Sequence, residues 1–243
     1  YPVHWGGDPA CTWDGMAATL KGGLHLGLSG FGYWSHDVPG FHGLPDFMNS
    51  WPEPDLYLRW TQLGVFSSHM RYHGTSPREP YRYPEVADQV RHWWHLRYAL
   101  IPYLMDQGVK VGRSGYPLLR ALVLHHQDDP ACWRIDDQFF CGEALLVAPV
   151  LSADGVRDVY LPRGRWVDLW TGEALQGPRW LTGVPSPMGR CPVYAAAGAA
   201  IRYYPDRVQS TNEMDGERMA LLRFDASYKG LAASPLGALT GLS

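Results

Sequence analysis

An aspartate near the start of this 243-residue chain stands in a setting that suits chemistry. Asp8 follows the apolar residues 1–3, Trp5 and the glycine pair Gly6 and Gly7. Because glycine lacks a Cβ, the backbone can turn sharply there and approach a ligand closely. Residues 1–3 are expected to end a buried strand, which places Asp8 on the loop beyond it. Barrels and open α/β sheets carry their reactive groups at such strand ends. The alternative is a tight turn with a solvated carboxylate.

A second stretch repeats this layout. Residues 24–37 contain apolar residues, glycines and an aromatic pair, and they end in His36 and Asp37. Residues 13–20 have the spacing of a helix that ends at two glycines, and residues 24–29 resemble a strand. Strand, carboxylate loop, helix, strand and carboxylate loop is the order of a parallel βαβ unit. This order would bring Asp8 and Asp37 to one edge of a sheet.

The rest of the chain divides into further helical and extended patterns. Residues 54–69 and 83–104 have helical periodicity, the second with a kink expected at Pro102. Residues 117–126 are rich in leucine and valine, and we expect them to form the last parallel strand. Short strands separated by glycine, proline and aspartate then predict an antiparallel β-sandwich. These strands are expected at residues 144–149, 156–161, 164–169 and 192–202.

Four motifs resemble glycoside hydrolase family 31, and most of all its bacterial α-xylosidases. They are HWGGD at 4–8, GFGYWSHDVPGF at 30–41, LRWTQLG at 58–64 and SSHMRYHG at 67–74. The resemblance covers residues 1–204 and implies an α/β chain, the C-terminal part of a (β/α)8 (TIM) barrel followed by a small antiparallel β-sandwich domain. The implied domains are 1–140 for the barrel part and 141–204 for the sandwich. Residues 205–243 form a tail whose composition is typical of a disordered or loosely docked segment.

The same resemblance implies roles for five residues. Asp8 matches the catalytic general acid/base of a retaining α-glycosidase. Trp5, Phe41 and His73 match residues that line the family's sugar site. Asp37 matches an acidic residue that either binds sugar hydroxyls or braces its loop. The matching nucleophile would lie before the first residue, so the chain resembles the C-terminal part of a longer enzyme and is expected to be inactive alone.

Composition restricts the partners. The net charge of −3 gives no basic face for nucleic acid, and no apolar run is long enough to span a membrane. Eleven tryptophans and fourteen tyrosines suit an oligosaccharide or α-xyloside substrate, because sugar C–H faces stack on aromatic rings. The four cysteines lack CxxC spacing and indicate free thiols in a reducing, cytoplasmic setting. No cofactor is expected, and a homo-oligomer is compatible with the sequence.

Alternatives to an α-xylosidase-like hydrolase remain open at this point. One is an α-glucosidase or a related α-glycosidase of the same family. Another is a noncatalytic carbohydrate-binding protein, which would not need the Asp8 carboxylate. The least favoured is a metal site built from His4, Asp8, His36 and Asp37, because tetrahedral zinc sites use tighter sets of ligands.

Overall fold

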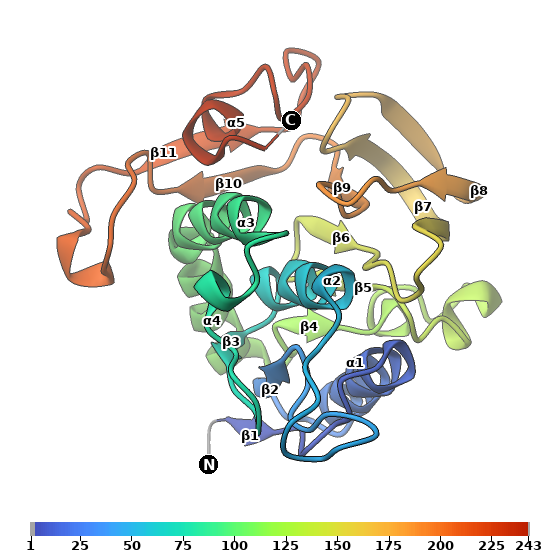
Figure 1. Cartoon of the computed structure of the whole chain (residues 1–243). Helices are drawn as coiled ribbons and strands as arrows, with labels where there is room; N and C mark the ends of the chain where they lie inside the picture. Colours follow the sequence, from blue (N-terminus) through green and yellow to red (C-terminus); the bar gives the residue numbers. More distant parts are fainter. Residues whose placement is uncertain (1–2, 243) are drawn as a thin grey trace.

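The computed structural model describes residues 3–242 and begins with a parallel sheet. Strands β1 (His4–Trp5), β2 (Trp34–Val38) and β3 (His69–Tyr72) lie in the order β1-β2-β3. Helices α1 (Trp13–Leu28) and α2 (Pro54–Val65) connect them, so this region is the C-terminal part of a TIM barrel (Figure 1). Residues 1–2 of the expected strand end lie outside the described residues.

Helix α1 is longer than the sequence predicted. It passes through Gly22 and Gly23 and ends at Leu28, so the strand expected at 24–29 is wrong. A Cβ on Gly23 would lie 2.0 Å from Cζ2 of Trp34, which shows that this glycine lets α1 pack closely against β2. The helix continues because its buried residues keep a helical period, namely Met16, Leu20, Gly23, Leu24 and Gly27.

The long helical pattern that follows β3 forms two helices. A short 3₁₀ turn, η1 (Pro80–Arg82), precedes α3 (Ala87–Ala99) and α4 (Ile101–Ser114). The break falls at Leu100, and Pro102 lies in the first turn of α4, where its missing N–H leaves no hydrogen bond unmade. The expected kink is therefore a helix boundary, and the pattern extends ten residues beyond the predicted end at 104.

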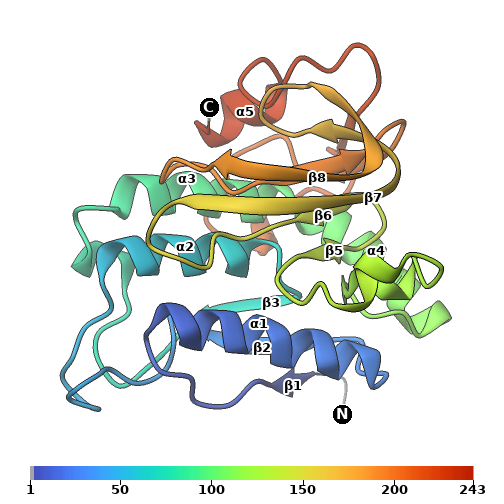
Figure 2. The ribbon, with the colours of Figure 1, turned by 90° about the vertical axis from the view of Figure 1, so that its right-hand side faces the viewer.

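A six-stranded antiparallel sheet follows, in the order β4-β5-β6-β9-β7-β8. Its strands are β4 (Leu119–Arg120), β5 (Phe139–Cys141), β6 (Leu145–Val147), β7 (Val156–Asp168), β8 (Ala174–Pro185) and β9 (Val193–Ala196). Figure 2 shows β7 and β8 on the opposite side of α2 from β1, β2 and β3. No helix within residues 3–242 is both long and apolar enough to cross a membrane.

The stretch 117–126 is not the last barrel strand. Only Leu119 and Arg120 are extended there, and they pair antiparallel with Cys141 and Phe140 before the chain enters the 3₁₀ turns η2 (Leu122–Leu124) and η3 (Pro130–Trp133). A run of leucine and valine shows that a segment is buried, but it does not show whether the segment pairs with a parallel or an antiparallel strand. The division expected at residue 140 therefore falls inside the antiparallel sheet, which begins at β4.

The segment expected to be a tail has a defined structure up to residue 242. Strand β11 (Ala220–Arg223) pairs antiparallel with β10 (Ala200–Tyr203), and η4 (Thr211–Glu213) lies between them. Helix α5 (Pro235–Thr240) packs against α3, and Leu231 and Leu236 are at most 1% exposed. The apolar residues of this segment are too few to give a period, yet several of them, including Leu222, Phe224, Leu231 and Leu236, are buried by neighbouring elements.

Helix α2 joins the two parts of the molecule through buried polar groups. Arg59 is 1% exposed, although it is a charged residue of an amphipathic helical pattern. Its guanidinium donates to the carbonyl oxygens of Ser186 and Arg190, the latter at 2.6 Å. Gln62 Nε2 donates to the Met188 carbonyl at 2.7 Å. The carbonyl oxygens of the loop 186–190 therefore accept the hydrogen bonds of Arg59 and Gln62, and both faces of α2 are buried.

Candidate active site

The five residues singled out by the sequence all lie at the carboxyl edge of the parallel sheet. Asp8 follows the end of β1, Asp37 is the penultimate residue of β2, and His73 comes directly after β3. Val38 pairs with Tyr72, so β2 and β3 end together, whereas Trp5 at the end of β1 pairs with Ser35 and residues 6–8 continue toward the same edge. Side chains that lie far apart in the sequence are thus brought together at one edge, because the strands run parallel.

Asp37 is the buried centre of the cluster. Arg71 Nε and Nη2 each lie 2.9 Å from Asp37 Oδ1, and Trp5 Nε1 donates to the same oxygen at 3.3 Å. Asp37 is 0% exposed, and its Oδ2 has no hydrogen-bond partner among the described residues. Leaving a buried carboxylate oxygen unpaired costs free energy, so this oxygen is suited to accept a hydrogen bond from a ligand.

Aromatic rings continue from Asp37 toward His73. Trp5 is 48% exposed, and its ring packs edge-on against Phe41 with 6.4 Å between centroids. Phe41 in turn lies 5.5 Å from the His73 ring. The Arg71 guanidinium lies 5.5 Å from the centre of the Trp5 ring, a cation–π contact that fixes the indole. The exposed ring surface can therefore hold the C–H face of a sugar.

Asp8 is exposed, and within residues 3–242 its carboxylate makes no hydrogen bond or ion pair. The loop around it is nevertheless fixed. Gly6 N–H donates to the Ser35 carbonyl at 2.8 Å, and Pro9 O accepts from Phe41 N–H at 2.7 Å. The φ of +90° at Gly7 favours glycine there. Asp8 is thus held next to the Phe41 loop with its carboxylate free.

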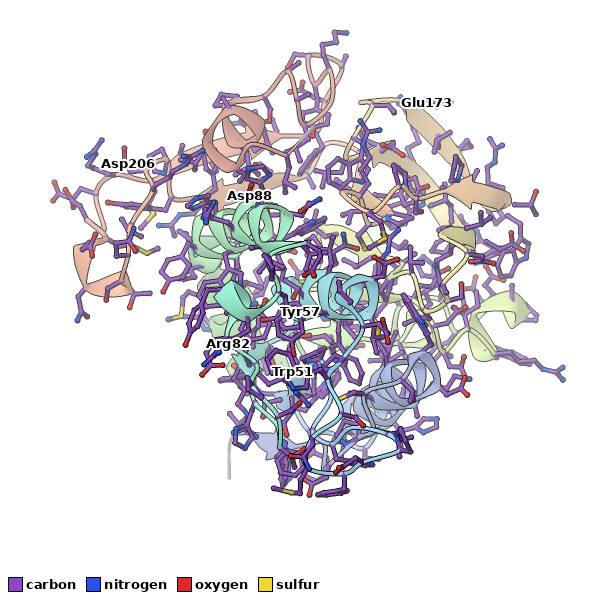
Figure 3. All side chains as sticks on the ribbon, in the orientation of Figure 1. Trp51, Tyr57, Arg82, Asp88, Glu173 and Asp206 are labelled. Carbon is purple, nitrogen blue, oxygen red and sulfur yellow. The ribbon has the colours of Figure 1, made fainter. Side chains whose placement is uncertain are left out.

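Stacked aromatic rings support the loop 74–84, which lies near the carboxyl edge of the parallel sheet. Tyr57 of α2 stacks on Tyr83 at 4.1 Å and on Tyr72 at 5.1 Å, and Trp51 packs against Tyr83 at 5.7 Å. Figure 3 shows Trp51 and Tyr57 in neighbouring positions below α2. The Tyr57 hydroxyl donates to the Arg78 carbonyl at 2.6 Å. These contacts hold the loop 74–84 against the sheet. Aromatic content is the one feature of the sequence that points to these contacts.

His36, next to Asp37, is a buried support residue. Trp60 Nε1 donates to its Nδ1 at 3.1 Å, and its Nε2 lies 2.9 Å from Ser67 Oγ. Because the Ser67 hydroxyl donates to the Leu63 carbonyl, it accepts the proton of His36 Nε2. Burial lowers the pKa of His36 to about 3, aided by the positive charges of Arg97 and Arg71. The imidazole is therefore neutral and fully hydrogen-bonded.

This arrangement contradicts the metal-site hypothesis. Both nitrogens of His36 are already engaged, and the His4 ring packs 4.0 Å from Phe31. Within the part of the chain that the structure describes, no group of three or more histidine, cysteine, aspartate or glutamate side chains is placed to hold a metal ion. The four cysteines are free thiols, and Cys11 accepts a hydrogen bond from Arg78 at 3.0 Å.

The buried His36 predicts a pH-dependent stability. Its folded-state pKa lies below the unfolded value, so the unfolded chain binds the proton more tightly and stability falls as pH drops below about 6.5. Urea unfolding should show a loss of roughly 2 kcal/mol from this group between about pH 7.5 and about pH 5. His36→Gln should remove this part of the pH dependence. An equal pH dependence in wild type and variant would contradict the assignment.

A parallel sheet with carboxylates and exposed aromatic rings at its carboxyl edge has the groups that sugar binding requires, and comparison with known proteins identifies the family. The TIM-barrel domain of glycosyl hydrolases family 31 matches residues 1–107, and the C-terminal domain of that family matches residues 115–201. The chain belongs to glycosyl hydrolase family 31.

Individual relatives cover most of this chain. An α-xylosidase of Emericella nidulans is 41% identical over 192 residues, which are 75% of this chain and 24% of that protein. A lysosomal α-glucosidase of Bos taurus is 39% identical over 70% of this chain and 18% of its own length. The solved cycloalternan-forming enzyme of Listeria monocytogenes, in complex with a pentasaccharide substrate, superposes with a TM-score of 0.84 at 26% identity, covering 92% of this chain and 22% of that one. The chain thus spans about a quarter or less of each of these relatives.

Proposed function

We propose that this chain provides the acid/base half of a retaining α-glycosidase site, with α-xylosidase-like specificity. The observation that carries the proposal is the grouping at one sheet edge of a free carboxylate, Asp8, with a buried carboxylate, Asp37, that has one unpaired oxygen. The flanking rings of Trp5, Phe41 and His73 offer the surface that a sugar needs.

Each side chain then has a chemical task. Asp8 would protonate the glycosidic oxygen as the bond breaks, and would afterwards take a proton from the attacking water. Asp37 Oδ2 would accept a hydrogen bond from a sugar hydroxyl while Arg71 and Trp5 hold Oδ1. Trp5 and Phe41 would pack on the sugar's C–H surface, and His73 would bind a hydroxyl. The nucleophile would come from another strand of the complete barrel.

The preference for α-xylosides over α-glucosides rests on similarity. The α-xylosidase of Emericella nidulans is similar over more of this chain than the bovine α-glucosidase, and at slightly higher identity. The direct test is the ratio of kcat/KM for an aryl α-xyloside and the matching aryl α-glucoside, measured on an enzyme that contains this chain within a full barrel. A ratio in favour of the glucoside would assign the chain to the α-glucosidases.

The isolated chain should show no measurable turnover of an aryl α-xyloside. Of the two carboxylates at this edge, Asp37 is buried and paired with Arg71, which leaves Asp8 without a partner that could attack the sugar. A purified sample should be assayed beside its Asp8→Asn and Asp37→Asn variants. Turnover that is abolished by Asp37→Asn would identify Asp37 as a nucleophile. Sugar affinity that is unchanged in both variants, without turnover, would place any binding elsewhere on the chain.

A further inference from the structure

A second hollow lies on the antiparallel sheet, separate from the edge that carries Asp8. It has a volume of about 540 Å³ and is formed by the start of β7, the middle of β8 and the residues around 137 and 151–154. Figure 2 shows β7 and β8 across α2 from the parallel strands. None of the residues used by the proposed active site lines this hollow.

Trp180 gives the hollow an aromatic wall. The indole is 51% exposed on β8, which is the edge strand of its sheet. The ring rests against Tyr160, with 5.1 Å between centroids and 50° between planes. Tyr160 is 5% exposed, and its hydroxyl donates to Asp129 Oδ2 at 2.6 Å. A fixed tyrosine therefore supports one part of Trp180 and leaves much of the indole open to solvent.

Charged groups in the hollow are held in defined positions. Arg157 is 8% exposed, and its Nη2 donates to the Asp137 carbonyl at 2.7 Å and lies 3.0 Å from Asp137 Oδ1. Arg157 Nε is buried without a hydrogen-bond partner among the described residues. The β7–β8 register shifts between Arg157 and Val159, and at this bulge Gly183 N–H donates to Asp158 Oδ1 at 2.7 Å. Bulges of this kind redirect a side chain out of the regular sheet pattern.

The chemistry of this lining selects the type of ligand. Three carboxylates, those of Asp137, Asp154 and Asp158, outnumber the single guanidinium and disfavour an anion. Asp154 and Asp158 already accept hydrogen bonds from the protein, and the described residues offer no metal cluster. An indole beside fixed donors and acceptors suits a neutral ring with hydroxyl groups at its rim, because the C–H face stacks while the hydroxyls bridge carboxylate and guanidinium.

We propose that the hollow around Trp180 is a second saccharide-binding site, which holds one or two units of a neutral oligosaccharide. Trp180 stacks on a sugar ring, and Asp158, Asp137 and Arg157 bind its hydroxyls. Such a site would keep a long substrate on the protein while its end is processed elsewhere, but its binding does not depend on catalysis at Asp8.

Fluorine NMR of the 243-residue chain labelled with 5-fluorotryptophan tests this assignment. Trp180→Phe identifies the Trp180 signal, and a Trp5→Ala background removes stacking at the Asp8 edge. The probes are a xyloglucan heptasaccharide and maltoheptaose, each added up to ~10 mM, enough to detect a Kd near 1 mM. We expect a saturable shift of the Trp180 signal with at least one probe, which persists in the Trp5→Ala background.

The signal of Trp133 is the matched control, since this indole is 63% exposed but lies outside the hollow. It should not move. No shift of Trp180 with either probe would overturn the proposal, as would a shift that disappears in the Trp5→Ala background or one shared equally by Trp133. A Trp180 shift that is unchanged in an Asp8→Asn variant would support the independence of the two sites.

Discussion

Replacing Asp8 by alanine, in an enzyme that joins this chain to the N-terminal part of a family 31 barrel, is expected to lower turnover of a natural disaccharide by about a hundredfold or more. A poor leaving group needs a proton as the glycosidic bond breaks, and Asp8 is the free carboxylate at this edge of the sheet. A substrate with an activated leaving group hardly needs that proton, so its first step should survive. The covalent intermediate should then accumulate, because no base activates water.

Azide distinguishes this role from a simple loss of structure. It attacks without a general base, so it should restore turnover of the activated substrate and give the α-glycosyl azide with retained configuration. Asp14→Ala is the matched control, because Asp14 is an exposed aspartate in the first turn of α1. If natural and activated substrates lose activity equally and azide has no effect, Asp8 is a loop brace or a sugar ligand.

Replacing Arg59 by methionine is expected to destabilise the chain by about 2–6 kcal/mol, because two carbonyl oxygens lose their charged hydrogen-bond donor. The variant keeps an unbranched side chain, which is shorter than arginine, and removes the donor to the carbonyl oxygens of Ser186 and Arg190. Each buried, unpaired acceptor costs about 1–3 kcal/mol. The loss should appear as a lower midpoint in urea unfolding.

Arg91→Met provides the comparison for this measurement. Arg91 has a 64% exposed side chain and forms a surface ion pair with Asp88, so its loss should change stability by less than about 1 kcal/mol. Because Arg59 joins α2 to the loop 186–190, its variant should also unfold in two steps, with the antiparallel sheet separating from the parallel strands. Equal stability of the two variants would show that water replaces the Arg59 contacts.

The sequence by itself determined that a parallel βαβ unit brings Asp8 and Asp37 to one sheet edge, although it placed the second strand at 24–29 instead of 34–38. Gly7 has a φ of +90° that favours glycine, and the repeat of the pattern at Asp37 predicts a shared sheet edge. Such information is local, because turn geometry and strand direction depend on neighbouring residues. Motifs of this length also carried the family resemblance.

Only the tertiary structure decided how these residues are used. Gly23 looked like a helix end, but it is the point where α1 packs against Trp34. Arg59 is buried, although the helical period alone does not show that the loop 186–190 covers that face of α2. Asp37 Oδ2 is left unpaired because Arg71 and Trp5 both donate their hydrogen bonds to Oδ1. Burial and pairing between distant segments arise only when the chain packs, so no local pattern could specify them.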